Sequence, residues 1–205
     1  MPKGIIYADF KAGFGMDRVE FALQNLSGKI LDVGYSVGGI HQKFLEKFGQ
    51  KNIYGVDIET KKDSAHYKKA SAQKIPFKPN FFDSVFAGEL IEHVQSPAKF
   101  LAQTNRVLKK GGVIIITTPN KDSLVNRITH SYETPIHISL LNYKELKELL
   151  EKNGFEVQEY IGMRYSEENC YGSKNKWSFF FRNLLHNFLP ASLQEEMVFK
   201  AIKVN

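Results

Sequence analysis

The chain has 205 residues, of which 42% are hydrophobic and 24% charged, and its formal net charge is +6. These fractions are typical of a soluble globular protein with one sizeable core. The single cysteine, Cys170, excludes an internal disulfide bond and favours a reducing compartment. The opening MPKGIIYADF lacks the long apolar core of a signal peptide, and no run is long enough to span a bilayer. We therefore expect a cytoplasmic protein.

The positive charge is compatible with an anionic substrate, nucleic acid or a membrane surface. The lysines that produce it are scattered along the chain, and we expect most of them on solvated faces. The net charge therefore does not indicate which of these partners the protein binds.

Two elements are predicted before residue 28. Residues 1–15 form an irregular segment rich in glycine and aromatic residues, which we interpret as an N-terminal flap over a pocket. A tail packed on the core is the alternative. Residues 16–27 have the apolar periodicity of an amphipathic helix.

Residues 29–39, KILDVGYSVGG, predict a buried strand, a tight turn and the start of a helix that runs from Ile40 to Gly49. Gly34 and Gly38 allow the backbone to pass close to a ligand, because no Cβ stands in the way. The helix behind them offers unpaired N–H groups at its N-terminus. A turn of this kind, after the first parallel strand, is where open α/β sheets bind nucleotide-like ligands.

The position of the acid in this motif favours a cationic ligand. A dinucleotide-binding turn has the pattern G-x-G-x-x-G, but Ser36 occupies the place of its middle glycine. Asp32 instead precedes the first glycine by two residues, and a carboxylate there is unfavourable for a pyrophosphate. An NAD-dependent oxidoreductase is therefore disfavoured, and a strand–turn–helix without a ligand is the remaining alternative.

A second predicted strand, residues 52–58, also ends in an acid, one βαβ unit after Asp32. Asp57 at this position can accept hydrogen bonds from both hydroxyls of a ribose. Ile58 would then offer an apolar face to adenine. The alternative is a solvated aspartate at the end of a strand.

Three stretches in the expected order resemble the class I S-adenosylmethionine (SAM) dependent methyltransferases. Residues 29–39 resemble the family's motif I, with Ser36 in place of the commoner glycine. Residues 81–94 match its FDxVxxxxxxEHV stretch. RVLKKGGVIIITTPN, residues 106–120, resembles its RVLKPGG-strand-TPN signature, with Lys110 in place of proline.

The resemblance implies an α/β fold of Rossmann-like type, in which helices cover both faces of a seven-stranded, mostly parallel sheet. The implied strand order is 3-2-1-4-5-7-6, with the last strand antiparallel. Residues 1–205 would form a single methyltransferase domain. Its later elements are a helix capped by Asn142, a sixth strand over residues 155–161 and a seventh over residues 197–204.

The resemblance also implies which residues hold the cofactor. Residues 70–77 align with the segment that flanks adenine, where Ser71 stands in place of the family's usual acid. The implied cofactor-binding residues are Asp32, Gly34, Tyr35, Gly38, Asp57, Ile58, Ser71, Ala72, Gln73, Ala87, Gly88 and Glu89.

Residues 162–194 form a helical insertion between strands six and seven, where the family usually has a short connection. Its apolar and aromatic residues recur on one helical face between residues 177 and 188. We interpret the insertion as a cap over the substrate pocket. A dimer surface, or a membrane-surface contact through residues 175–189, are the alternatives.

The predicted reaction is direct displacement, in which a nucleophile on a small-molecule acceptor attacks the methyl group of SAM and S-adenosylhomocysteine leaves. For a hydroxyl nucleophile an imidazole is a suitable general base. His137 is our first catalytic candidate and His93 the second, with a structural hydrogen bond to backbone as the alternative for each. The set of Glu89, Glu92 and these histidines has no recognised ligand spacing, so we expect no metal site.

The sequence thus predicts a SAM-dependent methyltransferase that is similar to the ubiquinone-biosynthesis O-methyltransferases, acting on oxygen rather than nitrogen. The Asn/Asp-Pro-Pro-aromatic tetrad of nucleobase amino-methyltransferases is absent from the fourth strand, which argues against nucleic acid as the substrate. Aromatic residues in 162–194 suggest an apolar or aromatic acceptor. The alternative function is a non-catalytic SAM-binding partner of another protein.

Overall fold

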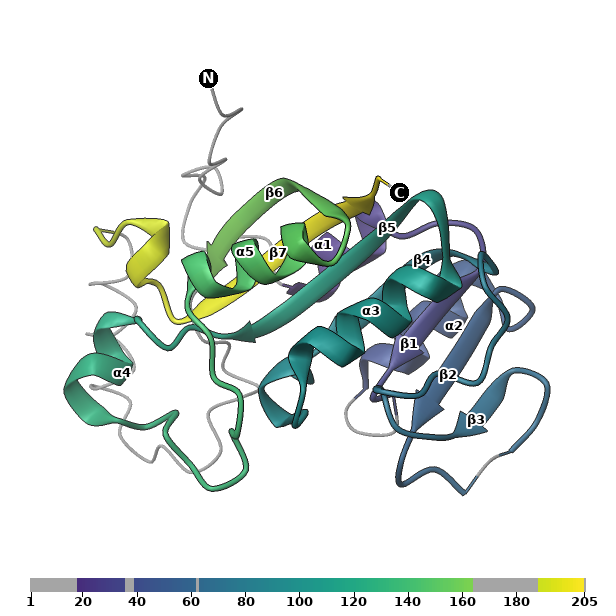
Figure 1. The fold of residues 1–205 in the computed structure, drawn as a ribbon, viewed down its shortest axis with the longest axis horizontal. Coiled ribbons are helices and arrows are strands. Elements are labelled where there is room, and N and C mark those ends of the chain that lie inside the picture. The colour runs from purple at the N-terminus through teal and green to yellow at the C-terminus, as the bar shows by residue number, and fades with distance from the viewer. Residues whose placement is uncertain (1–17, 36–38, 62, 164–187, 205) are drawn as a thin grey trace.

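The structure, a computed structural model, describes residues 18–35, 39–61, 63–163 and 188–204. Its seven strands form one sheet in the order β3-β2-β1-β4-β5-β7-β6 (Figure 1). The strands are β1 (Ile30–Val33), β2 (Ile53–Asp57), β3 (Tyr67–Lys69), β4 (Phe82–Gly88), β5 (Leu108–Pro119), β6 (Phe155–Met163) and β7 (Glu196–Lys203). Strand β7 runs antiparallel to both β5 and β6, and the other described pairings are parallel. The predicted fold class and strand order are confirmed.

Helices cover both faces of the sheet (Figure 1). On one face α3 (Pro97–Val107) and α5 (Tyr143–Lys152) bury apolar side chains such as Phe100 and Leu146 against the sheet. On the other face α1 (Arg18–Asn25) and α2 (Ile40–Phe48) contribute Phe21 and Phe44. The alternation of side chains along each strand supplies both cores, because neighbouring residues point to opposite faces.

The helix ends follow the capping rules. The Ser96 side chain accepts a hydrogen bond from the backbone N–H of Lys99, and Asn142 and Glu145 form a complete capping box at the start of α5. Gly49 follows α2 at φ +77°, and its N–H donates to the carbonyl of Leu45. The predicted end of α2 at Gly49 and the predicted start of α5 at Asn142 are therefore confirmed.

Strand β5 begins at Leu108, directly after α3, so Lys109 to Gly112 lie within the strand, before its apolar part. A short helix, α4 (Leu124–Thr129), occurs where no element was predicted, and a 3₁₀ turn, η3 (Ala191–Leu193), lies near the end of the predicted helical insertion. A second 3₁₀ turn, η1 (Ile91–His93), follows β4. Residues 1–15, Gly38 and most of the predicted cap, residues 164–187, lie outside the described residues.

None of the helices in the described part of the chain is long and apolar enough to cross a membrane.

Gly28 provides a test of the connection between α1 and β1. It has φ +68°, and a Cβ there would lie 2.4 Å from Oδ2 of Asp83, the oxygen that accepts a hydrogen bond from the backbone N–H of Lys29. We expect Gly28→Ala to lower the free energy of unfolding by more than the roughly 1–2 kcal/mol that a left-handed conformation alone costs.

Gly111→Ala is the matched control, since Gly111 has φ +74° but a Cβ there meets nothing within 4 Å. Urea denaturation of both variants provides the measurement. Equal losses in the two proteins would contradict the steric role of Asp83.

Candidate active site

The carboxyl ends of β1, β2 and β4 lie side by side because these strands are parallel neighbours. Asp32 pairs in register with Gly55, and Val33 with Val56, so the turn after β1 and the end of β2 meet at one edge. Gly34, at φ +82°, donates its N–H to the carbonyl of Val56 at 2.8 Å. A Cβ at Gly34 would lie 3.1 Å from Cδ1 of Leu90, so the bare backbone allows the segment after β4 to approach the turn.

Asp32 is buried and hydrogen-bonded to a histidine of the following helix. Its Oδ2 lies 2.8 Å from Nδ1 of His41, and Nε2 of that ring lies 3.1 Å from the hydroxyl of Tyr67 on β3. Burial raises the pKa of Asp32 above its ordinary value, and the hydrogen bond and charge of His41 oppose the rise. Asp32 on β1, His41 on α2 and Tyr67 on β3 thus form one hydrogen-bonded chain.

Tyr35 supports the turn from within the protein. Its ring is buried, with centroids 4.7 Å from His41 and 5.1 Å from Tyr67, and its hydroxyl hydrogen-bonds to that of Thr60. The ring lies against Gly55, where an added Cβ would be 2.5 Å from it. The Tyr35 side chain is therefore surrounded by protein groups. It contributes to a ligand site by supporting the turn after β1.

Asp57 and Ile58 lie at the end of β2, next to the glycine turn. The Asp57 carboxyl group is buried, and its Oδ1 accepts the backbone N–H of Glu59 at 2.7 Å. Ile58 is 63% exposed, an unusual position for a large apolar side chain. A buried acid and an exposed apolar side chain are thus neighbours at the end of β2.

The segment of Ser71, Ala72 and Gln73 reaches the same edge by way of β3. The backbone N–H of Ala70 donates to the carbonyl of Asp57 at 3.1 Å, which places this segment beside the end of β2. The Ser71 hydroxyl accepts the N–H of Gln73 at 3.2 Å, and Ala72 is buried.

The end of β4 brings a strained residue to the edge. Ala87 is fully buried, and Gly88 has no room for a Cβ, which would lie 2.7 Å from the Phe86 ring. Glu89 then adopts φ +49°, an uncommon conformation for a residue with a side chain. Its N–H donates to the carbonyl of Thr117 at 2.9 Å, and its Oε1 accepts the Thr117 hydroxyl at 3.0 Å. The neighbouring strand β5 thus holds the strained residue at both its backbone and its side chain.

Arg18 joins Glu89, which is partly buried, to a fully buried acid, Glu196. The same guanidinium nitrogen lies 3.1 Å from Oε1 of Glu89 and 2.9 Å from Oε1 of Glu196. Burial, and to a lesser extent the charge of Glu89, raise the pKa of Glu196 to about 8, although the charge and hydrogen bond of Arg18 oppose the rise. Neither Arg18 nor Glu196 was predicted as a site residue, because they lie at opposite ends of the chain and match no motif.

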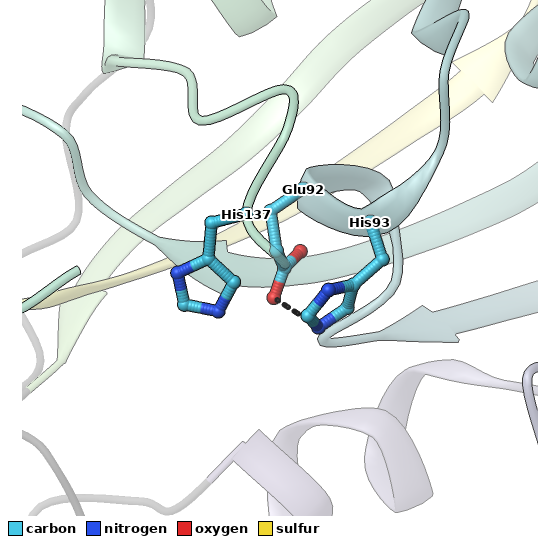
Figure 2. A group of neighbouring side chains, drawn as sticks. All are labelled: Glu92, His93 and His137. Carbon is cyan, nitrogen blue, oxygen red and sulfur yellow. Dashed lines mark ion pairs between the residues drawn. The ribbon is translucent and has the colours of Figure 1, made fainter. Parts of the chain in front are cut away.

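The two candidate histidines lie on either side of Glu92 (Figure 2). The ring centroids of His93 and His137 are 5.0 Å apart, although His93 belongs to η1 and His137 to the loop before α5. Glu92 is buried and accepts the Thr118 hydroxyl on Oε2 at 2.9 Å. Burial holds the pKa of Glu92 well above its ordinary value, and the charge of Glu89 adds to this.

The structure therefore brings the predicted residues to one edge of the sheet, with Gly38 outside the described residues. Sequence reasoning missed a set of supporting residues, most of whose contacts join residues far apart in the chain: Arg18, His41, Thr60, Tyr67, Thr118 and Glu196. His41 could have been identified from the sequence, because it is the second residue of the helix that follows the glycine turn.

Comparison with known proteins gives consistent results. A family model described as a methyltransferase domain matches residues 7–160. The chain is 31% identical over 176 residues to the mitochondrial ubiquinone biosynthesis O-methyltransferase of Homo sapiens, and this match covers 71% of the chain and 46% of the human protein. It is 27% identical over 202 residues to the ubiquinone biosynthesis O-methyltransferase of Bartonella bacilliformis, covering 85% and 79% of the two chains. The chain spans about half the length of the mammalian relatives that it matches.

A solved structure has a similar fold. It is a putative methyltransferase from Haloferax volcanii in complex with the Trm112 methyltransferase activator, with a TM-score of 0.67 and 14% identity. The match covers 91% of this chain and 88% of that one.

The raised pKa of Glu196 predicts a pH-dependent stability. The folded state keeps the carboxyl group protonated up to pH of about 8, whereas the unfolded chain ionises near the ordinary value of 4.5. Between these values the folded state binds more protons, so the free energy of unfolding falls as the pH rises. We expect Glu196→Gln to reduce this fall, measured from urea midpoints at about pH 5.5 and 8.5.

Glu156→Gln, at an exposed position on the adjacent strand β6, is the control and should leave the pH dependence unchanged. An identical fall in wild type and Glu196→Gln would show that the buried acid does not determine it.

Proposed function

Because the chain belongs to the class I SAM-dependent methyltransferases, we propose that it transfers a methyl group from SAM to a hydroxyl oxygen of a small, apolar or aromatic acceptor. The observation that carries this proposal is the pair of buried carboxylates, Asp32 and Asp57, on either side of the bare backbone at Gly34. SAM supplies an activated methyl group on a positively charged sulfur, and S-adenosylhomocysteine is the product.

The residues at the edge of the sheet fit such a cofactor. Asp57 can accept the ribose hydroxyls, and the exposed side chain of Ile58 can cover one face of adenine. Ser71 and Gln73, beside the end of β2, offer polar groups to the edge of the adenine ring. Gly34, Gly38 and the backbone of Ala87, Gly88 and Glu89 are proposed to surround the methionine end of the cofactor.

His137 and His93 are proposed to act on the acceptor hydroxyl. The Nδ1 of His137 lies 2.6 Å from the carbonyl of Tyr132, and the Nδ1 of His93 lies 2.9 Å from the carbonyl of Ile136. Each Nδ1 must carry the proton in these hydrogen bonds, so each Nε2 presents a lone pair. Such a lone pair can accept the proton of the hydroxyl as its oxygen attacks the methyl group.

The apolar character of the acceptor is supported by the surface around His137. Ile136 and Ile138, the residues on either side of it, are 66% and 54% exposed. An acceptor with an apolar body could bury these side chains while its hydroxyl reached the imidazole. The ubiquinone biosynthesis O-methyltransferases named above are relatives whose names indicate an O-methyl product, which agrees with oxygen as the acceptor atom.

The alternative function is that of a non-catalytic SAM-binding partner of another protein. The putative methyltransferase of Haloferax volcanii is a neighbour with this fold that is bound to a second protein, a methyltransferase activator. A screen of metabolite extracts with isotopically labelled SAM distinguishes the two, because a labelled product from the isolated chain requires intrinsic activity. Binding of SAM without turnover on any acceptor would favour the partner-dependent function.

Replacing Asp57 tests the cofactor assignment. We expect Asp57→Ala to weaken the binding of S-adenosylhomocysteine by about 1–3 kcal/mol, because charged hydrogen bonds to the ribose are lost. Isothermal titration calorimetry provides the measurement. Thermal unfolding of the variant shows whether the fold survives the loss of the contact between Asp57 and the N–H of Glu59.

Asp63→Ala is the matched control, since the Asp63 side chain is 70% exposed in the connection between β2 and β3. It should bind S-adenosylhomocysteine as the wild type does. Unchanged affinity in a folded Asp57→Ala variant would refute the ribose assignment.

A further inference from the structure

We propose that His41 is a positioning residue for the cofactor, which holds the Asp32 carboxylate at the glycine turn in the ionised form that a cationic ligand needs. This inference rests on the proposed function, because SAM and S-adenosylhomocysteine both carry an ammonium group on their amino acid tail. His41 was not predicted as a site residue from the sequence. Its role is inferred from the contacts that its ring makes in the fold.

The first argument is the contact between the two side chains. Nδ1 of His41 lies 2.8 Å from Oδ2 of Asp32, and the side chains are 12% and 5% exposed. Asp32 belongs to β1, and His41 is the second residue of α2, so the contact joins the elements on either side of the glycine turn. Within the described part of the chain Oδ1 accepts no hydrogen bond. His41 therefore fixes the carboxylate through one oxygen and leaves the other for a ligand.

The second argument is the direction of the protons. An ionised carboxylate only accepts hydrogen bonds, so Nδ1 of His41 carries a proton and donates to Asp32. Nε2 then presents a lone pair, which accepts the Tyr67 hydroxyl at 3.1 Å. Burial raises the pKa of that hydroxyl, and the electrostatic effects of Tyr35 and Asp32 add to the rise, so Tyr67 keeps its proton and remains a donor. Tyr67 thus favours the neutral tautomer of His41 whose donor faces Asp32.

The third argument is the packing that fixes the imidazole of His41. Its ring centroid lies 4.7 Å from that of Tyr35, in a tilted arrangement, and 5.5 Å from that of Tyr67, edge-on. Tyr35 is held in turn by the bare backbone of Gly55, where a Cβ would lie 2.5 Å from the tyrosine ring, and by the hydroxyl of Thr60. An imidazole held in this way keeps its donor in place before a ligand arrives, so binding requires less reorganisation.

The fourth argument is the balance of effects on the Asp32 carboxyl group. Burial raises its pKa, the hydrogen bond and charge of His41 lower it, and the charge of Asp57 on β2 raises it. Tyr67 of β3 and Tyr35 of the turn face the imidazole and act on Asp32 through it. Among the described residues, His41 is therefore the one group in this balance that favours the ionised carboxylate.

Removal of the His41 donor shifts this balance toward the neutral acid. Asp32 then takes up a proton at a higher pH than in the wild type, because the hydrogen bond that opposes the effect of burial is lost. A neutral carboxyl group attracts an ammonium group less strongly than a carboxylate does. Affinity for the ligand is therefore lost as the pH falls through the pKa of Asp32, and without His41 this loss begins at a higher pH.

Two substitutions separate the hydrogen bond from the shape of the side chain. In His41→Asn the amide nitrogen can take the place of Nδ1 and donate to Asp32, whereas in His41→Gln the amide lies at the place of Nε2, near Tyr67. The donor to Asp32 is thus kept in the first variant and lost in the second. Both variants lose the imidazole ring that packs against the two tyrosines, so they share the cost of lost packing.

The test is titration of the full chain with S-adenosylhomocysteine by isothermal titration calorimetry at about pH 5.5 and 8.5. His41→Gln should weaken binding by about tenfold at the lower pH, as expected for the loss of a hydrogen bond to a charged group, and by less at the higher pH. His41→Asn should bind within about threefold of the wild type at both.

His66→Gln is the matched control, because His66 is also half-buried, with Nδ1 3.0 Å from the carbonyl of Ile53 and its ring stacked on that of Tyr54. It should leave the affinity for S-adenosylhomocysteine and its pH dependence unchanged. Circular dichroism and thermal unfolding establish that each variant is folded.

A second measurement needs no cofactor. In a chain that carries isotope-labelled aspartate, NMR follows the carboxyl signal of Asp32 through a pH titration, and Asp32→Asn identifies the signal. We expect the midpoint of this titration to lie at a higher pH in His41→Gln than in the wild type, because burial is then less opposed. The midpoint in His41→Asn should stay near that of the wild type.

Two results would overturn the inference. One is an Asp32 midpoint that is the same in the wild type and in folded His41→Gln. The other is an equal loss of affinity in His41→Asn and His41→Gln at both pH values, which would assign the effect to the packing of the ring. A chain that shows the shifted midpoint but binds no S-adenosylhomocysteine contradicts only the cofactor assignment, and a chain that binds it with an unshifted midpoint contradicts only the role of His41.

Discussion

The parallel pairing of β1 with β2 and β4 is the constraint on which the rest of the structure depends. Three strands that end at one edge bring together a turn, two acids and the segment before η1, although these are far apart in the chain. Each of these strands is buried by helices on both faces, so its register is set by apolar packing on two sides. The polar groups of the site are therefore positioned by the burial of apolar side chains that never contact a ligand.

Burial of acids at this edge has an energetic cost. Asp32, Asp57, Glu92 and Glu196 are all buried, and among the described residues the compensation comes from few cations and many hydrogen-bond donors. Arg18 is shared between Glu89 and Glu196, and His41 contacts Asp32. Burial raises the pKa of three of these acids, Asp32, Glu92 and Glu196, and so favours their neutral form at this edge.

The strained backbone of Glu89 belongs to the same edge. A residue with a side chain at φ +49° costs of order 1 kcal/mol, and the contacts to Thr117 and Arg18 hold it in place. Because Glu89 is the first residue after β4, its conformation directs the chain into η1, where Glu92 and His93 lie. Strain, buried charge and the histidine pair thus belong to one continuous segment.

Local signals in the sequence determined much of this protein. The glycine turn, the acids at the ends of two strands and the capping box at Asn142 are local signals, because each depends on residues close together in the chain. The fold class and strand order came from the resemblance of such stretches to the class I SAM-dependent methyltransferases, and the structure has that order. Only the tertiary structure decided which groups support the edge where β1, β2 and β4 end. The contacts of Arg18 with Glu196, of His41 with Tyr67 and of Glu92 with Thr118 join distant elements, and no local pattern encodes them. The pairing of His93 with His137 around one buried carboxylate likewise follows from backbone hydrogen bonds between η1 and a later loop, which exist only once the sheet has formed.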